Sequence, residues 1–274
     1  MKISGKLFVI TGAGNGMGRE IALQLLAKGA LVAGVDLSET GLSETEELAG
    51  PAAVRFSTHA VSITDRAAVE KLPSQVAKTH GQPADALINI AGIIHRFAKV
   101  EELSVEEIEK VIDVNYWGTV YAVKAFLPVL KKRPEALIAN CSSMGALLPV
   151  PGQGAYCSSK GALRLFTDTL YAELEGTHVK VSLIYPGAIA TNITANSGVD
   201  VPGGRSTTAA EAKESPMKPM DVKDAGAIIV RGIESGKYRI IVGKDARAFD
   251  VLSRILPATS IRIIAKAVSK ALGV

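Results

Sequence analysis

The sequence predicts an α/β fold, in which one doubly wound parallel sheet of about seven strands forms a single domain over residues 1–274. Two observations predict this fold. Short apolar runs alternate with longer amphipathic segments, which favours parallel strands joined by right-handed helical crossovers. Hydrophobic residues make up 47% of the chain and aromatic residues only 5%. The apolar content is therefore mostly Ala, Val, Ile and Leu, which suits strands buried on both faces.

The elements follow one another in a regular order. Strands are predicted at the short apolar runs, near residues 7–11, 31–36, 53–57, 85–90, 136–142, 179–185 and 238–242. Helices are predicted between and after them, near residues 17–28, 39–49, 65–80, 104–131, 155–175, 221–235 and 246–272. Ligands of such a sheet bind beyond the carboxyl ends of its strands. Polar residues and glycines that follow a predicted strand are therefore the candidate site residues.

A glycine-rich turn follows the first strand. Residues 12–18 read GAGNGMG, between the apolar run 7–11 and an amphipathic helix. Glycines let the backbone turn tightly and approach a pyrophosphate, and the N-terminus of the helix supplies N–H groups and a positive dipole. The same glycines could form a turn and nothing more, but the strand–turn–helix order is the one that a dinucleotide site requires.

Asp36 ends the second strand, eighteen residues after Gly18. A carboxylate there accepts hydrogen bonds from an adenosine ribose and repels a 2′-phosphate. At an effective dielectric constant of 20, two charges 4 Å apart interact by about 4 kcal/mol before screening. Neither Lys nor Arg occurs in the turn or directly after Asp36, so the sequence predicts NAD rather than NADP. The alternative is that Asp36 only caps the next helix.

Ser143, Tyr156 and Lys160 form the predicted catalytic group. Tyr156 and Lys160 are four residues apart on a predicted helix, so they share one face. A neighbouring ammonium favours a phenolate and lowers the pKa of a Tyr. Ser143 follows the apolar run 136–141, and its hydroxyl can hydrogen-bond an oxygen whose charge changes during a reaction. By itself, the Tyr–Lys spacing could equally describe two surface residues.

These motifs and two further ones resemble the short-chain dehydrogenase/reductase family over nearly the whole chain. Residues 11–18 match its T-G-x-x-x-G-x-G turn, and residues 89–92 resemble its N-N-A-G motif with Ile90 in place of the second Asn. Residues 186–191 resemble its P-G-x-x-x-T segment, which holds the nicotinamide. One departure is Ser62, which stands where the family often has an Asp that contacts the adenine amine. The resemblance implies a Rossmann fold.

The resemblance also implies individual roles. Asn115, Ser143, Tyr156 and Lys160 match the family's catalytic tetrad, in which Asn115 would position a water molecule for proton relay and Lys160 would hold the nicotinamide ribose. Helices 104–131 and 155–175 would pair with a second subunit, giving a homodimer or homotetramer. The implied cofactor-binding residues are Gly12, Asn15, Gly16, Met17, Gly18, Asp36, Ser62, Ile63, Asn89, Ala91, Gly92, Tyr156, Lys160, Pro186, Gly187, Ile189 and Thr191.

The predicted function is hydride transfer between NAD and a secondary alcohol or its ketone. Tyr156 would take or give the proton as general base or acid, while Ser143 fixes the substrate oxygen. Epimerisation or dehydration through a transient ketone is an alternative on the same scaffold. A dinucleotide-sensing regulator without turnover is another, although a sensor has no need of Tyr156 and Lys160.

Residues 192–220 are predicted to form a substrate lid. The segment is rich in Gly, Ser, Thr, Ala and Pro and has no clear helical or strand pattern. A long irregular segment inside a compact domain is usually functional or mobile. It could also be a plain surface excursion. Further side chains that could face the substrate are His95, Arg96, Phe97, Met144 and Gln153, although His95 is more often a solvated or capping residue.

The C-terminal segment 246–274 is predicted to be a basic helical extension. Residues 237–274 contain eight basic and two acidic residues, and no acidic residue follows Asp250. Arg262, Lys266 and Lys270 recur every four positions and would line one helix face. Such a helix can lie on an anionic membrane, which would suit a lipophilic substrate. Packing of its apolar side on the domain or on a second subunit is the favoured alternative, because Pro257 interrupts the helix.

Composition narrows the classes of protein to which the chain could belong. The two cysteines, Cys141 and Cys157, predict neither a disulfide framework nor a metal site, and they suit a reducing compartment. A strand begins almost at once, without a leader pattern, and no uncharged apolar run approaches the ~18 residues of a spanning helix. A cytoplasmic location is therefore predicted. The net charge of +4 is modest, and nucleic-acid binding is not predicted despite a pI near 9.0.

Overall fold

The computed structural model describes residues 1–199 and 219–272, with side chains described to residue 266. Its single domain contains one parallel sheet of seven strands in the order β3-β2-β1-β4-β5-β6-β7. This confirms the predicted doubly wound α/β fold. The strands are β1 (Leu7–Thr11), β2 (Leu31–Asp36), β3 (Phe56–Ala60), β4 (Ala86–Asn89), β5 (Ala136–Cys141), β6 (Val179–Pro186) and β7 (Arg239–Val242).

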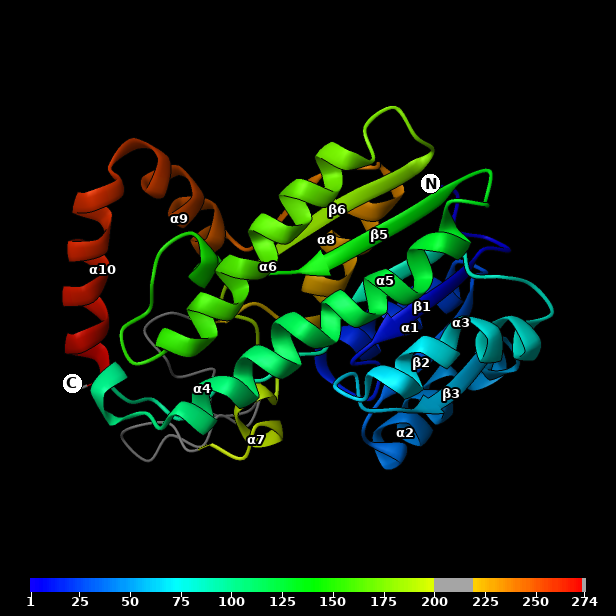
Figure 1. Ribbon diagram of the computed structural model, residues 1–274, viewed down its shortest axis with the longest axis horizontal. Helices are drawn as coiled ribbons and strands as arrows, with labels where there is room; N and C mark the ends of the chain where they lie inside the picture. Colours follow the sequence, from blue (N-terminus) through cyan, green and yellow to red (C-terminus); the bar gives the residue numbers. More distant parts are fainter. Residues whose placement is uncertain (200–218, 273–274) are drawn as a thin grey trace.

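Helices cover both faces of the sheet (Figure 1). Those of the described ranges are α1 (Gly16–Ala27), α2 (Glu39–Ala49), α3 (Arg66–His80), α4 (Val105–Ile112), α5 (Gly118–Leu130), α6 (Gly154–Glu173), α7 (Ile193–Asn196), α8 (Val222–Glu234), α9 (Lys244–Ile255) and α10 (Pro257–Leu272). Residues of α1, α2 and α8 contribute to one apolar cluster, and residues of α3, α5 and α6 contribute to another. No helix within the described residues has the length and apolarity needed to cross a membrane.

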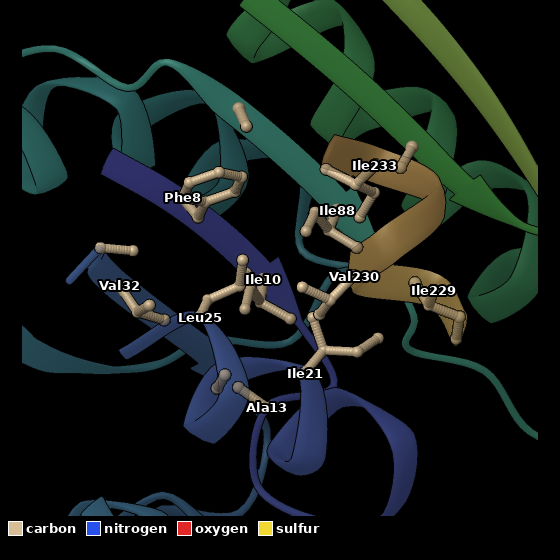
Figure 2. Packing of buried hydrophobic residues seen from close by; sticks show 14 of the residues in the cluster. Phe8, Ile10, Ala13, Ile21, Leu25, Val32, Ile88, Ile229, Val230 and Ile233 are labelled. Atoms are coloured by element: carbon tan, nitrogen blue, oxygen red, sulfur yellow. The ribbon is translucent and has the colours of Figure 1, made fainter. Parts of the chain in front are cut away.

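The first cluster shows how sequence patterning builds the core. Phe8 and Ile10 are two residues apart on β1, so their side chains point to the same face of the sheet. Ile88 of β4 lies beside them. Ile229, Val230 and Ile233 of α8 pack over these strand residues (Figure 2). Because β1 is fully buried on both sides, it anchors the glycine-rich turn that follows it.

Strand register brings the predicted site residues to one edge. Thr11, the last residue of β1, is paired with Val35 of β2 and with Asn89 of β4. The strands on both sides of β1 therefore end close to the start of the glycine-rich turn. The order of strands reverses between β1 and β4, and a crevice at such a reversal is the usual ligand site of an open α/β sheet.

Three predicted elements differ from the structure. The third strand is Phe56–Ala60 rather than 53–57, because residues 50–55 form a 3₁₀ turn with Pro51 in its first positions. The predicted helix 104–131 is divided by a π turn at residues 113–117. The predicted helix 246–272 is divided before Pro257, which begins α10. A proline has no N–H to continue a helix, but it fits the first helical position.

The helices predicted to pair with a second subunit carry exposed apolar side chains. Trp117, in the π turn between α4 and α5, is 43% exposed, and Leu165 and Tyr171 of α6 are 68% and 40% exposed. Val105 of α4 is 63% exposed as well. The homodimer or homotetramer stays a prediction.

Candidate active site

The glycine-rich turn after β1 approaches the neighbouring backbone too closely for side chains. Gly12 has a φ of +76°, and a Cβ there would lie 2.8 Å from the Ala91 nitrogen. A Cβ on Gly18 would collide with the carbonyl oxygen of Gly12. Glycine is needed at both positions because the first requires a left-handed conformation and the second a close approach of α1 to the turn.

The N-terminus of α1 is left open toward this turn. Asn15 occupies the N-cap position but makes no side-chain capping hydrogen bond, and the first turn contains no acidic residue. The first N–H groups of a helix have no partner within the helix, and they attract anions. The turn and the helix start therefore fit a pyrophosphate, and this is the predicted position of the dinucleotide.

A cavity of about 360 Å³ lies above the turn. Most of the predicted cofactor-binding residues line it, namely Gly12, Asn15, Gly16, Met17, Gly18, Asp36, Ser62, Ile63, Ala91, Gly92 and Thr191. Sequence reasoning missed several lining residues, namely Leu37, Val61, Thr64, Ile90, Ile93, Lys110, Val114, Ile193, Asn196 and Ser197. Many of these are sequence neighbours of predicted residues, so the strand ends were identified correctly but their exposed side chains were not.

Asp36 lies at the cavity wall and binds backbone N–H groups. Its Oδ2 accepts a hydrogen bond from Gly14 N at 2.8 Å, and its Oδ1 accepts one from Ser38 N at 3.0 Å. The N-cap of α2 is Ser38, whose hydroxyl accepts from Gly41 N, so the alternative in which Asp36 caps this helix is wrong. A carboxylate has about four acceptor sites, which leaves capacity for ribose hydroxyls.

Arg19 is the basic residue that the fold brings close to the turn, but its guanidinium is already paired. It donates to Glu44 Oε2 at 2.6 Å, to Thr45 Oγ1 at 3.0 Å and to the Gly14 carbonyl. Arg19 does not line the cavity. It is therefore poorly placed to offset the charge of Asp36 toward a 2′-phosphate.

Asn89 does not line either cavity of the site. Its side chain is 3% exposed and donates from Nδ2 to Asn140 Oδ1 at 2.8 Å. Asn140 in turn donates to Thr167 Oγ1 at 3.0 Å. Asn89 therefore joins β4 to β5 and α6 inside the protein, and its role in cofactor binding stays a prediction. The residues that follow it, 90–92, do line the cavity.

A second cavity of about 350 Å³ adjoins the first. Ser143, Tyr156 and Lys160 lie in its wall, together with Pro186, Gly187 and Ile189 of the predicted nicotinamide segment. Met17, Ile90, Gly92, Thr191 and Ile193 line both cavities. The structure thus brings the end of β5, the start of α6 and the end of β6 together at the place where the two cavities meet.

The electrostatics of Tyr156 differ from the prediction. Burial raises the pKa of the Tyr156 phenol, and a hydrogen bond with the Ser143 hydroxyl opposes this only in part. The Lys160 ammonium is 6.0 Å from the centre of the Tyr156 ring and donates to the Cys141 carbonyl at 2.9 Å. Burial also lowers the pKa of Lys160. The protein's own groups therefore favour a protonated phenol, and the expected lowering of the Tyr156 pKa by Lys160 is wrong for these groups alone.

Asn115 supports the site from beneath. The π turn places its fully buried side chain against Ile93, whose N donates to Asn115 Oδ1 at 2.8 Å and whose O accepts from Asn115 Nδ2 at 2.9 Å. The second Nδ2 hydrogen is donated to Ser159 Oγ at 3.0 Å. A Cβ on Gly92 would lie 2.9 Å from Asn115 Oδ1 and 3.2 Å from Lys160 Nζ. Asn115 therefore fixes the backbone beside Lys160, while the predicted water relay stays a prediction.

Asp245 is a site residue that the sequence motifs did not reveal. It lies in the first turn of α9 and accepts a hydrogen bond from Ala188 N at 2.6 Å through Oδ2. A Cβ on Gly187 would collide with this carboxylate, and so would one on Gly243. Asp245 therefore holds the segment after β6 from a distant part of the chain. The two glycines are a possible signal, but nothing in the sequence links them to Asp245.

The described part of the predicted lid lines the dinucleotide cavity. Asn196 at the end of α7 donates from Nδ2 to Asn15 Oδ1 at 2.9 Å, and Ser197 Oγ accepts from Ile94 N at 3.0 Å. Residues 200–218 of the predicted lid lie outside the described residues. The role of the whole segment 192–220 as a lid stays a prediction.

The remaining candidates for substrate contact fall into two groups. Phe97, Met144 and Gln153 line the second cavity. Arg96 does not line it, and its guanidinium pairs with Glu107 at 2.7 Å on the surface. His95 is 4% exposed and is also absent from the lining, although its carbonyl accepts from Gln153 Nε2 at 2.9 Å. The solvated half of the interpretation that the sequence favoured is therefore wrong.

The C-terminal helix α10 packs only part of its apolar surface. Ile264 is 7% exposed, whereas Ile261 and Ile263 are 46% and 48% exposed. Arg262 and Lys266 are exposed, as the predicted basic face requires. The helix stands at the edge of the molecule, away from the strands (Figure 1). Packing on the domain is thus confirmed for Ile264, and contact with a membrane stays a prediction.

The glycine-rich turn below a helix N-terminus and the Ser–Tyr–Lys group at the carboxyl edge of a parallel sheet define a dinucleotide-binding α/β oxidoreductase. The short chain dehydrogenase family matches residues 6–201 of the chain. A relative in Mycobacterium tuberculosis, the putative oxidoreductase SadH, is 37% identical over 268 residues, which cover 97% of this chain and 96% of the relative. The chain therefore belongs to the short-chain dehydrogenase/reductase family.

Solved structures agree with this assignment. A short-chain dehydrogenase/reductase from Burkholderia phymatum in complex with NAD is 25% identical, with a TM-score of 0.82 and 97% of both chains covered. A short-chain dehydrogenase from Burkholderia cenocepacia in complex with NADP is 25% identical, with a TM-score of 0.79, covering 96% of this chain and 99% of the other. Similar folds thus hold either dinucleotide, so the preference of this chain depends on its own residues.

Proposed function

We propose that this protein interconverts a secondary alcohol and its ketone with NAD as the redox partner. The observation that carries the proposal is the Ser143–Tyr156–Lys160 group in the wall of a cavity that adjoins the dinucleotide cavity. NAD, when bound, would supply the hydride acceptor or, as NADH, the donor. The protein would supply orientation, proton transfer and the exclusion of water.

The residues of the site have distinct roles in this proposal. Ser143 and Tyr156 line the same cavity, so both hydroxyls can address one substrate oxygen. A protonated Tyr156 can donate its proton to a ketone oxygen, and as phenolate it can take the proton of an alcohol. Lys160 is a buried cation about one helical turn away, and its charge stabilises the phenolate form during transfer.

The preference for NAD rests on Asp36. Its carboxylate lies in the wall of the dinucleotide cavity beside the exposed Leu37, and Arg19 is occupied by Glu44. A 2′-phosphate near Asp36 would meet a like charge, and Arg19, the basic residue next to the turn, is already paired with Glu44. The proposed substrate is mainly lipophilic, because the second cavity is walled by Met17, Ile90, Ile94, Phe97, Met144, Val150, Ile189 and Ile193.

The full chain with NAD and a panel of secondary alcohols tests the proposal through NADH absorbance. Tyr156→Phe keeps the ring and removes the proton-carrying hydroxyl, so we expect kcat to fall at least ~100-fold while NAD still binds. Tyr171→Phe, which removes a hydroxyl on a part of α6 outside both cavities, is the matched control and should keep its activity.

Three results would contradict the proposal. A Tyr156→Phe variant with near wild-type kcat would remove Tyr156 from the chemistry. A product formed without stable accumulation of NADH would favour the alternative of epimerisation or dehydration through a transient ketone. NAD binding without turnover of any alcohol or ketone would favour the dinucleotide-sensing regulator.

A further inference from the structure

The second cavity, which holds Ser143, Tyr156 and Lys160, is called the reaction cavity below. Gln153 is a buried polar residue of this cavity that the proposed chemistry does not use. It occupies the N-cap position of α6, three residues before Tyr156, and its side chain makes no capping hydrogen bond. Gln153 is 3% exposed and lines the same cavity as Ser143 and Tyr156. Residues three apart at a helix start lie on one face, so Gln153 borders the space in which the proposed substrate would react.

One hydrogen bond fixes which end of the Gln153 amide is free. Its Nε2 donates to the His95 carbonyl at 2.9 Å. The reversed amide would place two carbonyl oxygens against each other, so this contact determines the orientation. Oε1 is then a buried acceptor without a hydrogen-bond partner among the described groups. An unpaired buried acceptor is unfavourable, and a ligand that donates a hydrogen bond to it would remove this cost.

The other walls limit the charge of such a ligand. Among the described residues, Lys160 is the only charged side chain that lines the reaction cavity. Its ammonium donates to the Cys141 carbonyl and lies over Tyr156, so it belongs to the catalytic group. The described part of the cavity therefore offers no separate cation for a carboxylate or a phosphate on the substrate.

We propose that the substrate is an uncharged, largely apolar alcohol with a second hydrogen-bond donor, which binds Gln153 Oε1. The donor would be a hydroxyl group or an amide N–H, within a few bonds of the reacting carbinol. This inference rests on the proposed function, since it assumes that Tyr156 and Ser143 bind the reacting oxygen. It makes Gln153 a specificity residue that separates such alcohols from analogues without the donor.

The rival account is that Gln153 only supports a loop. Its Nε2 bond to His95 and the bridge between Gln153 and Ala98 hold residues 95–98 against the start of α6. That role uses the donor end of the amide, whereas the proposal uses the acceptor end. Gln153→Glu keeps an acceptor and loses the donor, and Gln153→Leu loses both. The two variants therefore separate the accounts.

The experiment compares cyclohexanol, the cyclohexane-1,2-, 1,3- and 1,4-diols, and the monomethyl ether of each diol. The ethers keep the shape of the diols but cannot donate the second hydrogen bond. With the wild type and NAD, we expect at least one diol to exceed cyclohexanol and its own ether by at least ~10-fold in kcat/KM. Gln153→Leu should abolish this advantage, and Gln153→Glu should retain it. Val150→Ala, an apolar change in the same wall, should affect diol and ether alike.

Calorimetric Kd values for the same compounds, with NAD present, separate this inference from the proposed function. Turnover of cyclohexanol and all the diols at equal kcat/KM, unchanged in Gln153→Leu, would overturn the inference and leave the oxidoreductase activity standing. Loss of the advantage in Gln153→Glu as well would assign Gln153 to loop support. Diol binding that depends on Gln153 without any NADH formation would support the inference and count against the proposed function. If the compounds showed no binding and no turnover, both the inference and the proposed function would be overturned.

Discussion

The two cavities of the site are built in different ways. The dinucleotide cavity is shaped by backbone at the carboxyl ends of β1 and β4, where Gly12 and Gly18 leave no room for a side chain. The reaction cavity is walled mainly by side chains that come from loops, from α6 and from the segment after β6. Backbone geometry can be inferred from glycine spacing, whereas a wall of side chains depends on loop positions. The difference explains why cofactor class is easier to infer than substrate.

The largest effect is expected at the backbone-built cavity. In Gly18→Ala the new Cβ would collide with the Gly12 carbonyl, so the turn and α1 must separate. Overpacking at such a contact costs about 1–3 kcal/mol, and we expect NAD binding to weaken at least ~10-fold. Calorimetry with NAD measures this. Gly161→Ala, at a helical site with no atom within 4 Å of the new Cβ, is the control and should bind NAD normally. Equal Kd values for the two variants would contradict the comparison.

The next prediction concerns a side chain at the edge of the backbone-built cavity. We expect the wild type to prefer NAD over NADP, and Asp36→Asn to narrow the ratio of the two kcat/KM values at least ~10-fold, because the charge is lost while an acceptor remains. Asp36→Ala should also weaken NAD binding, since Gly14 N and Ser38 N lose their acceptor. Leu37→Arg should narrow the ratio further. A wild type that favours NADP would refute the charge argument.

The third prediction concerns Asp245, which holds the segment after β6 near the place where the two cavities meet. Asp245→Ala leaves Ala188 N without the carboxylate that now accepts its hydrogen at 2.6 Å. Loss of a hydrogen bond to a charged group costs about 1.5–3 kcal/mol, and we expect this decrease in the free energy of unfolding, measured in urea, together with a higher KM for NAD. Asp245→Asn keeps an acceptor and should recover most of both. Identical behaviour of Asn and Ala would mean that the hydrogen bond does not position residues 186–191.

The smallest effect is expected at two histidines, His59 of the edge strand β3 and His80 of α3. Ser57 Oγ hydrogen-bonds Nε2 of His59 at 3.0 Å and of His80 at 2.8 Å. Burial lowers the pKa of both His residues below the ordinary 6.5, and the charge of His80 lowers the pKa of His59 further. The unfolded chain then takes up protons more readily, so stability present above pH 6.5 is lost as pH falls through the lowered pKa values.

Thermal unfolding between pH 7.5 and 5 measures this loss. The double variant His59→Gln/His80→Gln should show a flatter pH dependence than the wild type over that range. NAD affinity at pH 7.5 should not change in the variant, because neither His lines the dinucleotide cavity. A wild type whose Tm rises as pH falls from 7 would contradict the sign of the argument.

The sequence was sufficient where short-range patterns decide the structure. All seven strands, the glycine-rich turn and the Ser143–Tyr156–Lys160 group were predicted, because apolar runs and motif spacing are local. Pattern alone failed where one or two residues break an element, as Pro51 does before β3 and as the π turn at residues 113–117 does within the helix that carries Asn115.

Contacts between distant segments were beyond the sequence. The buried hydrogen bond between Asn89 and Asn140 of β5 was not predicted, because it joins two strands that are far apart in the sequence. The Tyr156 pKa was expected to be lowered, but burial outweighs the hydrogen bond from Ser143. Asp245 and the free acceptor of Gln153 depend on where a C-terminal helix and a loop come to rest. Such facts follow from tertiary packing, which one sequence without a structure does not specify.

The Asp245 contact also bears on the order in which parts of the structure can form during synthesis of the chain. A growing chain that has reached Val242 already contains all seven strands, yet the carboxylate that holds Ala188 is still three residues away. The sheet can therefore close before the segment after β6 is secured. The hydrogen bond that holds Ala188 therefore becomes available only after the strands of the sheet have been synthesised, and it depends on a helix that lies outside the sheet.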